Sequence, residues 1–274
     1  MACHRAGERY TAFRNLRAQR AFQYRSYKAV PQAAGPDWLL ILVVACSLMA
    51  LGFLFVDESA AQWKASLPKE TLDLFRTITR LGKSENYLVP SGIIVLGLAF
   101  APWERLTLSA KAALFQVQMM GLFVFVAVAG AGLSNNVIKI AIGRARPRYF
   151  EEFGAHYFNS PGWASGFQSF PSGHSTTAGA MAIALTLLFP RFKWLWVAIG
   201  FWIAFSRVVV GAHYPSDIVA GFLYGAAFTW LLAKYCTNRR LLFRVREGFI
   251  RLPKTGGLSL SRVMKALHML IQKA

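Results

Sequence analysis

Residues 38–56 read WLLILVVACSLMALGFLFV, an apolar run that contains no charged residue. A helix of about 20 such residues spans the roughly 30 Å hydrocarbon core of a bilayer. The rest of the chain agrees with this reading, because 55% of its 274 residues are hydrophobic and only 16% are charged. This composition argues against a disordered chain and a water-soluble domain. The run therefore predicts the first crossing of an integral membrane protein.

Five further apolar runs follow the first and predict an all-α, polytopic fold with six transmembrane helices. Gly and Ala are frequent in the third run of the chain, as in helices that pack closely in lipid. An even number of crossings places both termini on one side of the membrane. The five expected ranges are 87–102, 112–133, 175–189, 194–211 and 218–232.

Two amphipathic segments outside these runs predict short interfacial helices. Residues 68–82 place Leu74, Ile78 and Leu81 on one face, which favours a helix on the outer membrane surface. Residues 260–271 show the same spacing with basic side chains in between, which favours a helix on an anionic inner leaflet; a disordered basic tail is the alternative. The predicted parts are a basic N-terminal segment (1–36), a six-helix membrane domain (37–236) and a basic amphipathic tail (237–274).

Basic residues gather near the two ends of the chain, which carries 31 Lys and Arg against 12 Asp and Glu, a net charge of +19. Loops rich in Lys and Arg stay in the cytoplasm, so both termini are predicted to be cytoplasmic. The layout favours a bacterial inner (plasma) membrane, with the opposite helix ends facing the periplasm or exterior. The basic flanks predict contacts with anionic lipids; nucleic-acid binding is disfavoured, and no obligatory protein partner is evident.

Polar residues cluster at the outer ends of the third to sixth runs, where charge is expensive and generally functional. In the first cluster, KIAIGRARP at 139–147, Lys139 and Arg146 are seven residues apart, so two helical turns bring both to one face. A stop-transfer cluster or a lipid-headgroup anchor is the alternative for this cluster alone. Arg144 within this cluster and Arg148 just after it are candidate headgroup contacts or interfacial anchors.

The second cluster is PSGH at 171–174, immediately before the fourth apolar run. A helix start presents free backbone N–H groups and the positive end of the helix dipole to an anion. The segment predicts a phosphate cradle formed by Ser172 and the backbone of Gly173, with His174 beside it. An ordinary helix cap with an interfacial histidine is the alternative.

The third cluster is SRVVVGAHYPSD at 206–217, which holds Arg207, His213 and Asp217. A carboxylate four residues after a histidine is able to accept from one ring nitrogen and leave the other as a nucleophile. A purely structural His–Asp pair is the alternative. A metal site is disfavoured, because the chain has no HExxH or closely paired His motif and three cations beside the site would repel a metal ion.

Together the three clusters resemble, in order and spacing, the signature KxxxxxxRP, PSGH and SRxxxxxHxxxD of the type 2 phosphatidic-acid phosphatase and vanadium haloperoxidase superfamily. The six-crossing layout is similar to that of its membrane lipid phosphatases. The resemblance implies a metal-independent lipid phosphatase that needs no cofactor, with His213 as nucleophile, Asp217 as its orienting partner and His174 as acid and then base. The implied phosphate-binding residues are Lys139, Arg146, Ser172, Gly173 and Arg207.

The resemblance leaves the substrate open among polyprenyl diphosphate, phosphatidylglycerol phosphate, phosphatidic acid and lipid A. Phosphotransfer to another lipid through the same phosphohistidine is the alternative reaction, and halide oxidation is disfavoured because haloperoxidases are soluble. A non-catalytic protein that binds or transports anionic lipid is the remote alternative. The aromatic segment 149–170 is expected either to cover the site as a lid or to form an interfacial aromatic belt.

Overall fold

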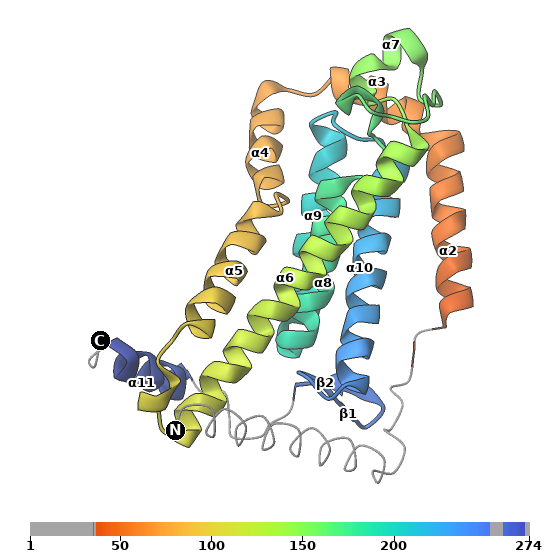
Figure 1. Ribbon diagram of the computed structural model, residues 1–274. Helices are drawn as coiled ribbons and strands as arrows, with labels where there is room; N and C mark the ends of the chain where they lie inside the picture. The colour runs from red at the N-terminus through yellow and green to blue at the C-terminus, as the bar shows by residue number, and fades with distance from the viewer. Residues whose placement is uncertain (1–34, 36, 253–259, 272–274) are drawn as a thin grey trace, which may run out of the picture.

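The structure is a computed structural model and describes residues 35, 37–252 and 260–271. It is mostly helical, with a single small β-hairpin among the described residues (Figure 1). The predicted N-terminal segment, residues 1–36, lies outside the described residues except for Gly35. The long helices are α2 (Trp38–Leu51), α5 (Glu85–Ala99), α6 (Leu108–Ile142), α8 (Gly173–Leu188), α9 (Lys193–Val209) and α10 (Pro215–Asn238).

Four helical stretches within the described residues are long and apolar enough to cross a membrane: Trp38–Ala65, Leu108–Ile142, Pro190–Val209 and Pro215–Asn238. α5 and α8, with 15 and 16 residues, are shorter than this and stand in the same bundle (Figure 1). The chain is therefore a helical membrane protein with four candidate spans, and the count of six crossings stays a prediction.

The first helix runs on beyond the expected end of its apolar run at Val56. The π-helical turn η1 (Gly52–Val56) connects α2 directly to α3 (Asp57–Ala65). A Cβ added at Gly52 would lie 3.4 Å from the Cα of Ser216, so the helix passes close to the start of α10. This close approach carries Asp57, the first charged residue after the apolar run, into the protein interior, where its side chain is fully buried.

The core of the bundle is α8, which packs against α6, α9 and α10. Two glycines allow α8 and α10 to touch through their backbones. A Cβ at Gly179 would collide with the carbonyl of Phe222, and one at Gly225 would collide with the carbonyl of Thr176. Small residues at a helix interface are the usual device for close packing in lipid. The contact fixes the start of α8 beside the start of α10.

The outward faces of the bundle are apolar, as lipid contact requires. Along α2, for example, Leu39 is 71% exposed and Leu42 is 59% exposed. The helix α4 (Lys69–Arg80) forms as predicted within 68–82, but it packs along α9 through Phe75, whose ring centroid is 6.3 Å from that of Trp202. The apolar face of α4 is thus only partly covered by protein. Phe75 contacts α9, whereas Leu74 remains exposed.

The other short elements lie at the two ends of the bundle (Figure 1). The hairpin β1 (Arg244–Arg246) and β2 (Phe249–Arg251) and the helix α11 (Leu260–Ile271) lie at one end, where Ala266 of α11 is buried against Leu106 and Leu114. The 3-10 turns η2 (Trp103–Arg105) and η5 (Pro190–Phe192) precede α6 and α9. The opposite end carries η3 (Pro147–Tyr149), α7 (Phe150–Phe153) and η4 (Ser165–Phe167).

Candidate active site

The three polar clusters meet at the end of the bundle that carries α7. Lys139 lies in the last turn of α6, and Arg207 in the last turn of α9. Ser172 is the N-cap of α8, where its Oγ accepts from the backbone N–H of Ser175 at 3.4 Å. The backbone N–H of Ser172 donates to the carbonyl of Asp217 at 3.0 Å, which joins the second cluster directly to the third.

The first cluster does not lie on one continuous helix, contrary to the expectation from its spacing. α6 ends at Ile142, and Gly143 adopts a left-handed conformation with φ 68°. A Cβ at Gly143 would collide with the backbone of Asn159, so glycine is needed for both reasons. Arg146 follows in extended conformation. Its charge still acts on the side chains of Lys139 and Arg207.

Lys139, Arg146 and Arg207 lie within electrostatic range of His174 at the start of α8. A Cβ at Gly173 would lie 3.8 Å from Nζ of Lys139, so that ammonium group adjoins the α8 N-terminus. Burial, followed by the charge of Arg148, lowers the pKa of Arg146. The Nε atoms of Arg146 and Arg207 are buried and have no hydrogen-bond partner within the described part of the chain. Unused guanidinium donors beside a helix N-terminus are suited to an oxyanion.

His213 and Asp217 form the pair that their spacing predicts. Nδ1 of His213 lies 3.6 Å from Oδ2 of Asp217, and Oγ of Ser169 donates to that same oxygen at 2.6 Å. The backbone N–H of Tyr214 donates to it at 2.9 Å. Burial lowers the pKa of His213 to about 3, although Asp217 opposes the shift. The imidazole is therefore neutral, with one nitrogen turned to the carboxylate.

His174 lies in the first turn of α8 and is half-buried. A Cβ at Gly82 would lie 3.0 Å from Cδ2 of His174, so the turn before α5 packs directly on this ring. The charges of Arg207, Lys139 and Lys83 act on the ring, and Lys83 is a cation that the sequence reasoning missed. A half-buried histidine near the cations of a phosphate site is suited to proton transfer at a phosphate.

Arg144 does not take the position expected of a headgroup contact or interfacial anchor. Its side chain is fully buried, and it forms ion pairs with Asp217 at 2.6 Å and with Asp57 at 2.7 Å. Asp57 and Ser169 were missed by the sequence reasoning, because neither belongs to a recognisable motif. The available signal was Asp57 itself, an acidic residue at the end of a long apolar run.

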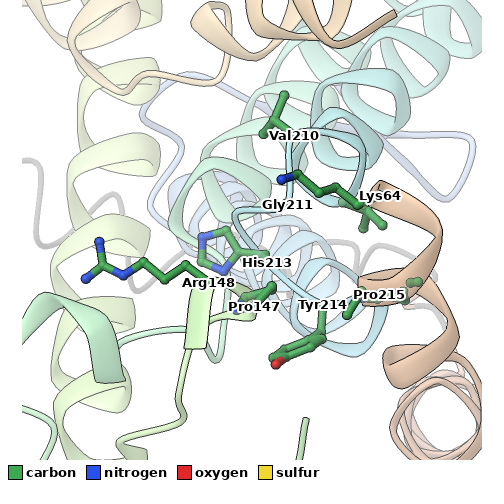
Figure 2. Close-up of a pocket in the computed structure, with 11 residues that line it drawn as sticks. Lys64, Pro147, Arg148, Val210, Gly211, His213, Tyr214 and Pro215 are labelled. Carbon is green, nitrogen blue, oxygen red and sulfur yellow. The ribbon is translucent and has the colours of Figure 1, made fainter. Parts of the chain in front are cut away.

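A cavity of about 230 Å³ adjoins His213 and is lined by two further cations, Lys64 of α3 and Arg148 of η3 (Figure 2). Figure 2 shows Lys64 and Arg148 on opposite sides of the His213 ring. The side chain of Lys64 packs against Gly211, where a Cβ would lie 3.0 Å from its Cε. Arg148 thus remains a candidate headgroup contact, and Lys64 joins it.

Comparisons with known proteins identify the family of the chain. The PAP2 superfamily profile matches residues 120–241. A lipid A 1-phosphatase from Rhizobium johnstonii is 38% identical over 76% of this chain and 84% of its own. A lipid A 4'-phosphatase from Bacteroides thetaiotaomicron is 31% identical over 48% of this chain and 59% of its own.

A solved structure also resembles the chain, that of a transmembrane PAP2-type phosphatidylglycerolphosphate phosphatase from Bacillus subtilis. It is 24% identical, with a TM-score of 0.48, and the match covers 72% of this chain and 92% of that one. The sequence matches identify the class of enzyme as integral membrane phosphatases. The chain belongs to the PAP2 superfamily, in its membrane lipid phosphatase branch. The family resemblance seen in the three clusters is thereby confirmed.

Proposed function

We propose that the chain hydrolyses the phosphate monoester at position 1 of lipid A, by way of a phosphohistidine on His213. The observation that carries the chemistry is the neutral, Asp217-paired His213 at the same end of the bundle as His174 and three cations. The choice of substrate is supported by the Rhizobium relative, which is named a lipid A 1-phosphatase and is matched over 84% of its length. The match to the 4'-phosphatase covers less of both chains.

The first half-reaction transfers the phosphoryl group to the enzyme. Nε2 of His213 attacks phosphorus, the bond between phosphorus and the sugar oxygen breaks, and His174 gives a proton to that departing oxygen. Asp217 holds the Nδ1 proton and stabilises the positive ring that results. In the second half-reaction, His174 takes a proton from water, which attacks phosphorus, and the N–P bond breaks to release inorganic phosphate.

The cations stabilise the charge on the transferred group. Lys139, Arg146 and Arg207, with Ser172 and the backbone N–H of Gly173, surround the equatorial oxygens of the phosphoryl group, where preorganised donors lower the barrier. These residues supply fixed positive charge, so the reaction is proposed to proceed without a metal ion. The cavity between Lys64 and Arg148 receives the polar headgroup next to the ester.

The enzyme is proposed to cross the bacterial inner membrane six times, with α5 and α8 as the two short crossings. α8 is largely buried against α6, α9 and α10, so most of its surface faces protein and not lipid. Both termini would then be cytoplasmic and the site periplasmic. The chain divides at the proposed limits, with basic segments 1–36 and 237–274 on either side of a phosphatase domain, 37–236.

Phosphate release from purified protein in detergent tests this function. The substrates are lipid A, phosphatidylglycerol phosphate, phosphatidic acid and polyprenyl diphosphate, each with EDTA present and with His213→Ala as the control. We expect release from lipid A that the variant lacks. A preference for another of the four lipids would overturn the substrate, and phosphate appearing on an added acceptor lipid instead of in solution would establish phosphotransfer. Loss of all activity in EDTA would contradict the metal-independent reaction.

A further inference from the structure

Behind the His213–Asp217 pair lies a second carboxylate, joined to the first by one arginine. The Arg144 guanidinium donates through Nη1 to Oδ1 of Asp217 at 2.6 Å and through Nη2 to Oδ2 of Asp57 at 2.7 Å. All three side chains are fully buried. The three groups come from the helix after α2, the loop after α6 and the first turn of α10, which are distant in sequence.

Asp57 also holds the start of α10, the helix that carries Asp217. Its Oδ1 accepts from the backbone N–H of Ser216 at 3.0 Å, and its Oδ2 accepts from Oγ of Ser216 at 2.5 Å. A carboxylate that accepts from a first-turn N–H stabilises a helix N-terminus through hydrogen bonding and the helix dipole. Asp57 thus contacts both Arg144, which donates to the Asp217 carboxylate, and Ser216, which precedes Asp217 in the chain.

The guanidinium itself has little freedom. Its Nε and Nη2 donate to the carbonyl of Ala155 at 3.2 and 2.7 Å, and its Cζ lies 4.4 Å from the ring centroid of Tyr214. With both edges engaged, Arg144 holds Oδ1 of Asp217 and leaves Oδ2 to face His213. The orientation of the catalytic carboxylate therefore depends on a group whose other side is fixed by Asp57.

We propose that Asp57 is a positioning residue. Through Arg144 it keeps the Asp217 carboxylate oriented toward His213, and its own charge keeps the buried group beside His213 negative overall. An Arg144–Asp217 pair alone is neutral and offers little attraction to the positive ring that forms on His213. With Asp57 the three groups carry one net negative charge, and in a buried site that charge is weakly screened. The proposal rests on the phosphohistidine reaction of the proposed function.

The direct test is Asp57→Asn, which removes the charge and keeps the shape of the side chain, with the exposed neighbour Glu58→Gln as the matched control. We expect kcat for lipid A to fall roughly 10- to 100-fold, as for residues that act through a catalytic group. KM should stay within about 2-fold, because the cations that bind phosphate are untouched. Glu58→Gln should leave both constants unchanged.

Inhibition adds a readout that a merely structural role would not move. Orthovanadate adopts the five-coordinate geometry of phosphoryl transfer, whereas inorganic phosphate reports only on ground-state binding. Asp57→Asn should weaken inhibition by vanadate about as much as it lowers kcat, and should leave inhibition by phosphate unchanged. The proposal would be overturned if Asp57→Asn weakened inhibition by vanadate and by phosphate equally, or if it weakened neither.

The double variant Asp57→Asn/Arg144→Gln removes one charge of each sign and restores the single negative charge of Asp217. It should recover part of the kcat lost in Asp57→Asn, because its net charge equals that of the wild type, and it gives a second variant to measure if the single variant fails to fold. A double variant as inactive as His213→Ala, in folded protein, would overturn the proposal. An active wild type with an unaffected Asp57→Asn would refute this inference alone, whereas a wild type that releases no phosphate would refute the proposed function.

Discussion

His213 is 3% exposed, and its burial makes the stability of the enzyme depend on pH. Because burial lowers its pKa to about 3, the unfolded chain binds a proton between that value and about 6.5 that the folded chain does not. Stability should therefore fall as the pH falls below about 6.5. We expect the Tm of the wild type to drop more between about pH 7.5 and about pH 5 than the Tm of His213→Gln, measured in the same detergent. An equal drop would contradict the buried, neutral histidine.

Replacing His174 should allow the two half-reactions to be measured separately, because the proton that it donates matters most for a poor leaving group. In His174→Gln we expect the first half-reaction to slow about 10²- to 10⁴-fold for an alkyl phosphate, and much less for an aryl phosphate, whose oxygen leaves without a proton. Water attack also needs the histidine, so the aryl substrate should give a burst of about one product per enzyme. Rapid-mixing kinetics would show this burst. Equal slowing of the first turnover with both substrates would exclude the proton-donor role.

The motif residues could be predicted from the sequence because their chemistry requires fixed spacing. Lys139, His174 and His213 were identified as candidates in this way, whereas Asp57 was not, because its partners in space are far from it in sequence. Arg144 shows the same limit: an arginine beside a motif suggests a surface anchor until the ion pair with Asp217 is seen. Long-range pairs are decided by packing, which local pattern does not encode.

At the scale of elements, the apolar runs predicted where the bundle helices lie but not where they end. The helix expected to stop at Val56 continues to Ala65, because close packing of Gly52 on α10 keeps Asp57 inside. α6 stops at Ile142, earlier than the proline at 147 suggested, because Gly143 turns the chain. Both boundaries are set by tertiary contacts of a glycine, and a hydropathy pattern does not contain them.

The segment between α6 and α8 packs on its own aromatic rings, with Tyr149 stacked on Phe167 and Phe153 stacked on Tyr157. Trp163 lies outside this cluster and is 75% exposed. As a lid side chain at the membrane interface, it should help admit lipid but not soluble substrate. Trp163→Ala should raise KM for lipid A several-fold and leave a short soluble phosphate unaffected. Trp194→Ala, equally exposed at the far end of α9, is the control. Equal losses on both substrates would refute the lid.

At the scale of the whole molecule, the bundle separates two kinds of positive charge. The cations of the site lie at the end that carries α7, and the hairpin with its arginines lies at the other end, which also carries α11 (Figure 1). In the proposed function, the buried cations of the site bind the substrate anion, whereas the exposed arginines of the hairpin resist translocation. The proposed orientation follows from the exposed arginines of the hairpin, because Lys and Arg in short loops bias the orientation of a membrane protein during insertion.

Cysteine labelling in intact cells tests that orientation. In a cysteine-free background, Glu152→Cys places a thiol on α7 and Glu247→Cys places one in the exposed hairpin turn; both side chains are exposed, so both are accessible to reagent. A maleimide that enters the periplasm but not the cytoplasm should label position 152 at once and position 247 only after the inner membrane is permeabilised. Labelling of both positions in permeabilised cells is the control for reactivity. The reverse order would place the site in the cytoplasm, and a lipid phosphate of the outer leaflet could not then be the substrate.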